Sequence, residues 1–88
     1  MKIKAEEFEN QDADLIYIAK RLRDATKIEA ILTEGGVDYA VEADEYQGGT
    51  IFRRTRIGAF FYVLPTVREN AVSLLKANGF RAMDVSGL

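Results

Sequence analysis

Three arginines in the middle of the chain are the residues whose types best suit a charged ligand. Arg53, Arg54 and Arg56 lie close together in an 88-residue chain whose net charge is −2. Guanidinium groups form paired hydrogen bonds with carboxylates and phosphates. If the segment is extended, Arg54 and Arg56 share one side and Arg53 lies on the other. One hypothesis is that these three residues bind an anionic small molecule or a protein partner.

The same arginines have an alternative role inside the chain. Gly48 and Gly49 mark a turn between them and an acidic group. A hairpin at this turn would place opposite charges on neighbouring strands, which is a stabilising arrangement. Such an acidic group could also bind a metal ion. A solvated strand edge explains these acidic residues better, so we predict no metal site. The members of the acidic group are Asp38, Glu42, Asp44 and Glu45.

A second candidate site is aromatic. In the segment 57–64, IGAFFYVL, period-two alternation places Phe60 and Tyr62 on one face of a strand. If the other face meets helices, these two rings lie on an open sheet face. They would serve there as a homo-oligomer contact or as a platform for stacked bases. The acidic balance of the chain favours the oligomer contact, and the RNA-recognition motif is matched only at Arg56, Ala59 and Phe60.

Composition excludes several function classes. The chain has no cysteine and no histidine, which removes thiolate chemistry and the commonest general base and metal ligand. No GxxxxGK[ST] phosphate loop is present. We therefore predict a protein that is not an enzyme and needs no cofactor. No apolar run approaches the ~20 residues of a membrane span and no signal peptide opens the chain, so we expect a cytoplasmic protein.

A duplicated pattern of helix, glycine stop and strand organises the chain. The two copies are TKIEAILTEGGVDYAVEA at 26–43 and TVRENAVSLLKANGFRAMD at 66–84. Each opens with Thr-x-x-Glu, which predicts a capping box at Thr26 and another at Thr66. Each helical stripe ends before Gly36 or Gly79, a residue suited to the left-handed position after a helix. Leu32 and Leu75 occupy matching places, so we expect both to be buried.

These elements predict an α+β fold. The strands are expected near 15–21, 37–43, 57–64 and 80–84. A single helix from Asp12 to Glu34 is the competing interpretation, rejected because the cap at Thr26 would then lie inside it. The order βαββαβ predicts a ferredoxin-like plait, a four-stranded antiparallel sheet with two helices on one face. Residues 1–14 are expected to be an N-terminal extension and residues 15–88 a single domain.

Two stretches of the chain resemble a known family. IYIAKRLRDATKIEAILTEGGVDYAVE and FFYVLPTVRENAVSLLKANGF resemble the prokaryotic signal-transducing proteins, a domain family of unknown function. The matching features are Glu29-Ala30, Leu32 with Gly36, and Val63 with Pro65. The resemblance covers about Leu15 to Asp84. It implies a bacterial, ferredoxin-like domain related in shape to the PII nitrogen-signalling proteins, whose functional loop would correspond here to 44–56.

The function expected from these observations is that of a small regulatory or signal-transducing interaction domain. The predicted partner is a second copy of the chain, forming a dimer, with an anionic ligand or a protein as a further partner. The alternative is an RNA-binding or single-stranded nucleic-acid-binding domain that uses the open sheet face. The two alternatives differ in how salt affects association, because nucleic-acid binding weakens steeply as salt rises.

Overall fold

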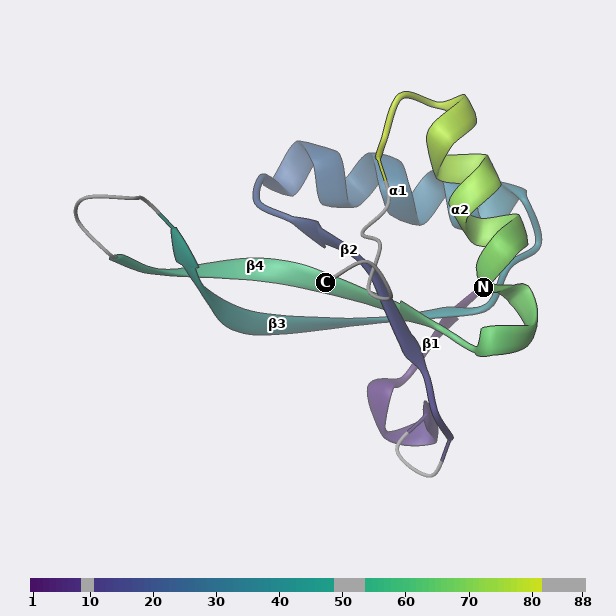
Figure 1. Ribbon diagram of the computed structural model, residues 1–88, viewed down its shortest axis with the longest axis horizontal. Helices are drawn as coiled ribbons and strands as arrows, with labels where there is room; N and C mark the ends of the chain where they lie inside the picture. Colours follow the sequence, from purple (N-terminus) through teal and green to yellow (C-terminus); the bar gives the residue numbers. More distant parts are fainter. Residues whose placement is uncertain (9–10, 49–53, 82–88) are drawn as a thin grey trace.

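The fold is a four-stranded sheet with two helices over one of its faces (Figure 1). The computed structural model describes residues 1–8, 11–48 and 54–81. Within these ranges the predicted α+β architecture is confirmed. The strands are β1 (Lys2–Ile3), β2 (Asp14–Ala19), β3 (Tyr39–Gly48) and β4 (Arg54–Val63), the helices are α1 (Leu22–Glu34) and α2 (Arg68–Ala77), and two short 3-10 helices are η1 (Ala5–Phe8) and η2 (Pro65–Val67).

The sheet is mixed, so the prediction of an all-antiparallel sheet is wrong. The strand order is β1-β3-β4-β2. β4 is antiparallel to both of its neighbours, as expected for the core of a plait. The fourth strand comes from the N-terminus, and β1 runs parallel to β3. Phe80 and Arg81, expected to open a last strand at 80–84, are not in a strand, and 82–84 lie outside the described residues.

The N-terminal segment packs against the sheet. The amino group of Met1 donates to the carbonyl of Val37 at 2.6 Å, and the amide of Tyr39 donates to the carbonyl of Met1 at 3.0 Å. Lys2 Nζ lies 3.2 Å from Glu29 Oε1 on α1. The segment expected to be an extension therefore supplies the edge strand β1. A strand of two residues has no periodicity by which sequence reasoning could detect it.

The first helix begins one turn earlier than predicted. α1 starts at Leu22, with Arg21 as N-cap and no side-chain capping bond. The capping box at Thr26 is therefore wrong, since its Oγ1 donates to the carbonyl of Leu22 at 3.0 Å from within the helix. β2 precedes α1 as a separate strand, so the competing helix from Asp12 is wrong as well.

The second capping box is wrong for a similar reason, but both predicted helix stops are confirmed. Thr66 lies in η2, and α2 begins at Arg68 without a side-chain cap. At the other ends, Gly36 has φ 72° and Gly79 has φ 86°. The amide of Val37 donates to Leu32 at 3.0 Å and that of Phe80 to Leu75 at 2.9 Å. Both helices thus end in a Schellman motif.

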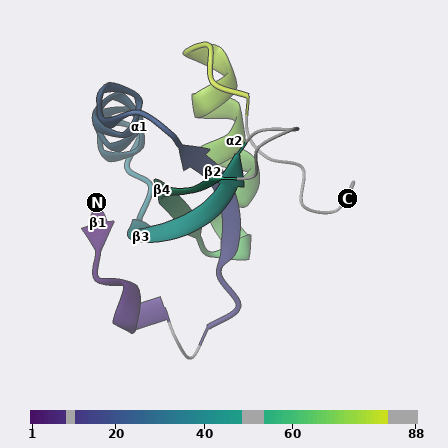
Figure 2. The same cartoon turned by 90° about the vertical axis from the view of Figure 1, so that its left-hand side faces the viewer.

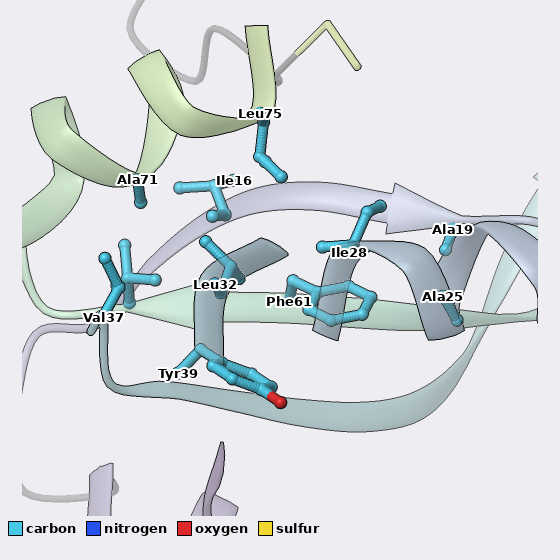
Figure 3. Packing of buried hydrophobic residues seen from close by; sticks show 11 residues of the cluster. Ile16, Ala19, Ala25, Ile28, Leu32, Val37, Tyr39, Phe61, Ala71 and Leu75 are labelled. Atoms are coloured by element: carbon cyan, nitrogen blue, oxygen red, sulfur yellow. The ribbon is translucent and has the colours of Figure 1, made fainter. Parts of the chain in front are cut away.

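The main core lies between the helices and the sheet (Figure 3). Leu32 and Leu75 are fully buried in it, as predicted, and Phe61 and Val63 point inward from β4. The register between β2 and β4 shifts between Leu15 and Tyr17. The extra residue of this bulge, Ile16, is also fully buried in the core. These buried residues define the face of the sheet that the helices cover. The helices do not cover the opposite face.

Candidate functional site

Two of the predicted arginines, Arg54 and Arg56, lie at the beginning of β4. Arg54 stands opposite Gly48 in the β3–β4 register, and Arg56 stands opposite Tyr46. Arg53 lies outside the described residues. The acidic residues have other neighbours across the hairpin, since Glu42 is opposite Phe60, Asp44 opposite Gly58 and Glu45 opposite Ile57. The register therefore places no carboxylate directly opposite Arg54 or Arg56.

The acidic group is spread along the chain. Asp38 precedes β3, and one of its carboxylate oxygens lies 3.5 Å from the amino group of Met1. Glu42, Asp44 and Glu45 lie within β3 with exposed side chains. Among residues 1–8, 11–48 and 54–81, no group of His, Cys, Asp and Glu is placed to hold a metal ion.

The aromatic pair lies on the face of the sheet that the helices do not cover. We call the side chains of Leu15, Ile18, Phe60 and Tyr62 the helix-free face. Leu15 stands opposite Tyr62 and Ile18 opposite Phe60 in the β2–β4 register. All four side chains are partly exposed. Their neighbours Tyr17 and Ala59 pack against the main core instead, as the alternation of a strand requires.

The N-terminal 3-10 helix covers another part of this side of the sheet. Figure 2 shows η1 on the side opposite α1 and α2. Phe8, its last residue, is 8% exposed, although it does not belong to the main core cluster. Ala40 of β3 is 1% exposed and is likewise outside that cluster. Sequence reasoning missed this contact, and its only signal was a large apolar residue in a strongly polar segment.

The surroundings of Tyr62 raise the pKa of its hydroxyl. Burial raises the pKa of the Tyr62 hydroxyl above its ordinary value, and the negative charges of Glu42 and Asp44 raise it further. The hydroxyl therefore stays protonated at neutral pH and can donate a hydrogen bond, but it is a poor nucleophile. The arrangement suits recognition by contact and hydrogen bonding rather than covalent catalysis.

An exposed apolar groove lies at the base of the β3–β4 hairpin, on the helix side of the sheet. Leu22 at the start of α1 is 84% exposed and Ile57 of β4 is 71% exposed. Period-two alternation puts Ile57 on the same strand face as Phe61, which meets the helices. Ile57 is nevertheless exposed, because β3 and β4 extend beyond the start of α1 (Figure 1). The groove has a volume of about 280 Å³ and is lined by Ala19, Lys20, Arg21, Leu22, Ala25, Val41, Ala43, Ile57, Gly58 and Ala59.

In the described part of the chain, no helix is both long enough and apolar enough to cross a membrane.

Comparison with known proteins adds no family to this description. No protein-family model matches the sequence, and neither the curated proteins nor the solved structures include a significant match to it.

Proposed function

We propose that the protein is a small non-catalytic interaction domain that self-associates through its helix-free face and acts as a regulatory or signal-transducing module. The observation that carries this proposal is the pairing of Leu15 with Tyr62 and of Ile18 with Phe60. These pairs place four partly exposed, largely apolar side chains side by side. Contiguous apolar surface of this kind is typical of a protein contact.

The physical basis of self-association is burial of the two rings. Aromatic side chains contribute most of the apolar area in many interfaces, and each Å² removed from water contributes about 25 cal/mol. A two-fold arrangement would bring the same patch of both copies together. Glu42, opposite Phe60, would then lie at the interface in both copies. The like charges would repel, so salt should strengthen the dimer.

Nucleic-acid binding is the alternative use of the same aromatic side chains. Stacked bases would bring phosphates close to Phe60 and Tyr62. The carboxylates of Glu42 and Asp44, which raise the pKa of Tyr62, would repel those phosphates. This local negative charge favours self-association over RNA.

The regulatory part of the proposal concerns the hairpin. The resemblance to signal-transducing proteins points to the connection between β3 and β4 as the functional loop. The register places no carboxylate directly opposite Arg54 or Arg56, and guanidinium groups suit an anionic ligand. The ligand would be a small molecule that carries phosphate or carboxylate groups.

Light scattering at increasing protein concentration tests the self-association. We expect the wild-type chain to form a dimer that salt strengthens. A variant with Phe60→Ser and Tyr62→Ser should remain folded and be monomeric. Leu22→Ser is the matched control, because Leu22 is exposed on the other side of the sheet and its loss should leave the dimer intact. A wild type that stays monomeric at high concentration would overturn the proposal.

A further inference from the structure

The outer edge of β3 is paired by β1 over only a small part of its length. β1 reaches Tyr39 and Ala40, whereas β3 continues to Gly48. The amide of Tyr39 donates to Met1, so the backbone groups of Tyr39 point toward this edge. By alternation, those of Val41, Ala43 and Glu45 point the same way. Beyond Ala40, no strand in the described ranges pairs with this edge.

A surface hollow runs along this edge where β1 ends. It is lined by Lys4, Glu6, Val41, Glu42, Ala43 and Asp44. Carboxylates outnumber amines in this lining, and the next residue of β3, Glu45, is also acidic. The amide of Glu45 donates to Asp44 Oδ1 at 2.7 Å, which closes the far end of the free stretch. The stretch left for a new strand is centred on Ala43, because the register of Ile3 opposite Ala40 gives the outward amide of Val41 a partner in β1.

We propose that this edge accepts an extended, positively charged segment of a partner protein, added to the sheet as a strand that continues the line of β1. Such strand addition draws its affinity from backbone hydrogen bonds and its specificity from the side chains beside them. β1 shows that the edge accepts a parallel strand. The carboxylates beside this edge would attract lysine or arginine side chains of the added segment.

The negative charge along this edge argues against pairing with the β3 edge of a second copy. Two β3 edges would bring Glu42, Asp44 and Glu45 of one copy against those of the other, and like charges on facing strands are destabilising. Charged residues are a common protection against such edge-to-edge pairing. The inference uses the backbone groups of the β3 edge, whereas the proposed dimer uses the helix-free face. Glu42 lies beside both surfaces.

A synthetic peptide tests the proposal. The probe is acetyl-Lys-Val-Lys-Val-Lys-Val-Lys-amide, added to the ¹⁵N-labelled full chain. We expect chemical-shift changes at Val41 to Glu45 and at Lys4, and slower hydrogen exchange at the amide of Ala43. Two control peptides keep the length: one has glutamate in place of lysine, and the other carries N-methyl groups on alternate amides, which keeps the charge but blocks strand pairing.

Two variants separate strand addition from loose ionic attraction. Ala43→Pro removes the outward amide, a change that sheet edges tolerate, and should weaken peptide binding about tenfold, the factor expected for one lost hydrogen bond. The double variant Glu42→Lys with Asp44→Lys should weaken binding of the lysine peptide and allow the glutamate peptide to bind. The absence of binding to the wild type, shifts at other surfaces, or equal binding of the N-methylated peptide would each overturn the proposal.

Discussion

Gly35 at the end of α1 lies directly against the side chain of Leu74 on α2. A Cβ atom placed on Gly35 would collide with Leu74 Cδ1 and approach the carbonyl of Ile31 to 3.3 Å. A methyl group at position 35 would therefore require the side chain of Leu74 to shift. The next residue, Gly36, has φ 72° and open space where a Cβ would stand. The adjacent glycines are thus required for different reasons, one steric and one conformational.

The first prediction separates these two reasons. Gly35→Ala should destabilise the fold by about 1–3 kcal/mol through overpacking, and adding Leu74→Ala should recover part of that loss. Gly36→Ala should cost about 1–2 kcal/mol through its left-handed backbone, and Leu74→Ala should not relieve it. Urea unfolding of the single and double variants measures the coupling. Equal coupling of both glycines to Leu74 would contradict the steric explanation.

The second prediction concerns the duplicated leucines. Leu32 and Leu75 are both fully buried, so Leu32→Ala and Leu75→Ala should each lower the free energy of unfolding by about 2–5 kcal/mol. Leu22→Ala is the matched control, because Leu22 is 84% exposed and its loss should change stability by less than about 0.5 kcal/mol. Chemical denaturation measures all three. A loss below ~1 kcal/mol for both buried leucines would contradict their place in the core.

The third prediction concerns alkaline pH. The pKa of Tyr62 is raised in the folded chain, chiefly by burial and then by Glu42 and Asp44. The unfolded chain therefore loses this proton at a lower pH than the folded chain does. The stability contributed by the neutral hydroxyl is complete below the ordinary tyrosine pKa, and it is lost as pH rises through the folded value. Tyr62→Phe should make the unfolding free energy fall less steeply in that alkaline range.

A companion measurement isolates the carboxylates. Glu42→Gln with Asp44→Asn should lower the pKa of Tyr62, as followed by the ultraviolet absorbance of tyrosinate. The pKa of Tyr17, which is raised by burial and by Asp24, should not change in that variant. An unchanged Tyr62 titration would show that burial alone accounts for the shift.

The fourth prediction concerns the arginines. Because the register opposes neither Arg54 nor Arg56 to a carboxylate, replacing Arg53, Arg54 and Arg56 with Ala should change stability by less than about 0.5 kcal/mol. Calorimetry of the wild type with nucleotides and inorganic phosphate should detect binding that this variant loses. The matched control replaces the exposed residues Arg21, Arg23 and Lys27 of the first helix region. A loss of stability without any wild-type binding would instead support pairing inside the hairpin.

Local sequence patterns determined most of the elements. The glycines after each helix predicted both Schellman endings, since few other residues adopt a positive φ at low cost. Alternation in β4 predicted that Phe60 and Tyr62 share one face of the strand, which would be open if the other face met the helices. These signals work because they depend on the backbone and on neighbours in the chain. They did not identify Leu15 and Ile18, the other members of the helix-free face, which the β2–β4 register brings beside Tyr62 and Phe60.

Tertiary structure decided what the local patterns could not. Thr26 and Glu29 have the spacing of a capping box, yet packing of Ala25 and Ile28 in the core extends α1 back to Leu22. The edge strand β1 exists only because Met1 and Lys2 meet Tyr39 and Glu29, residues distant in the sequence. Within the described ranges, the unpaired part of the β3 edge follows from where β1 stops. Such long-range contacts leave no periodic trace in a short segment, because their energy comes from the partner surface and not from the segment itself.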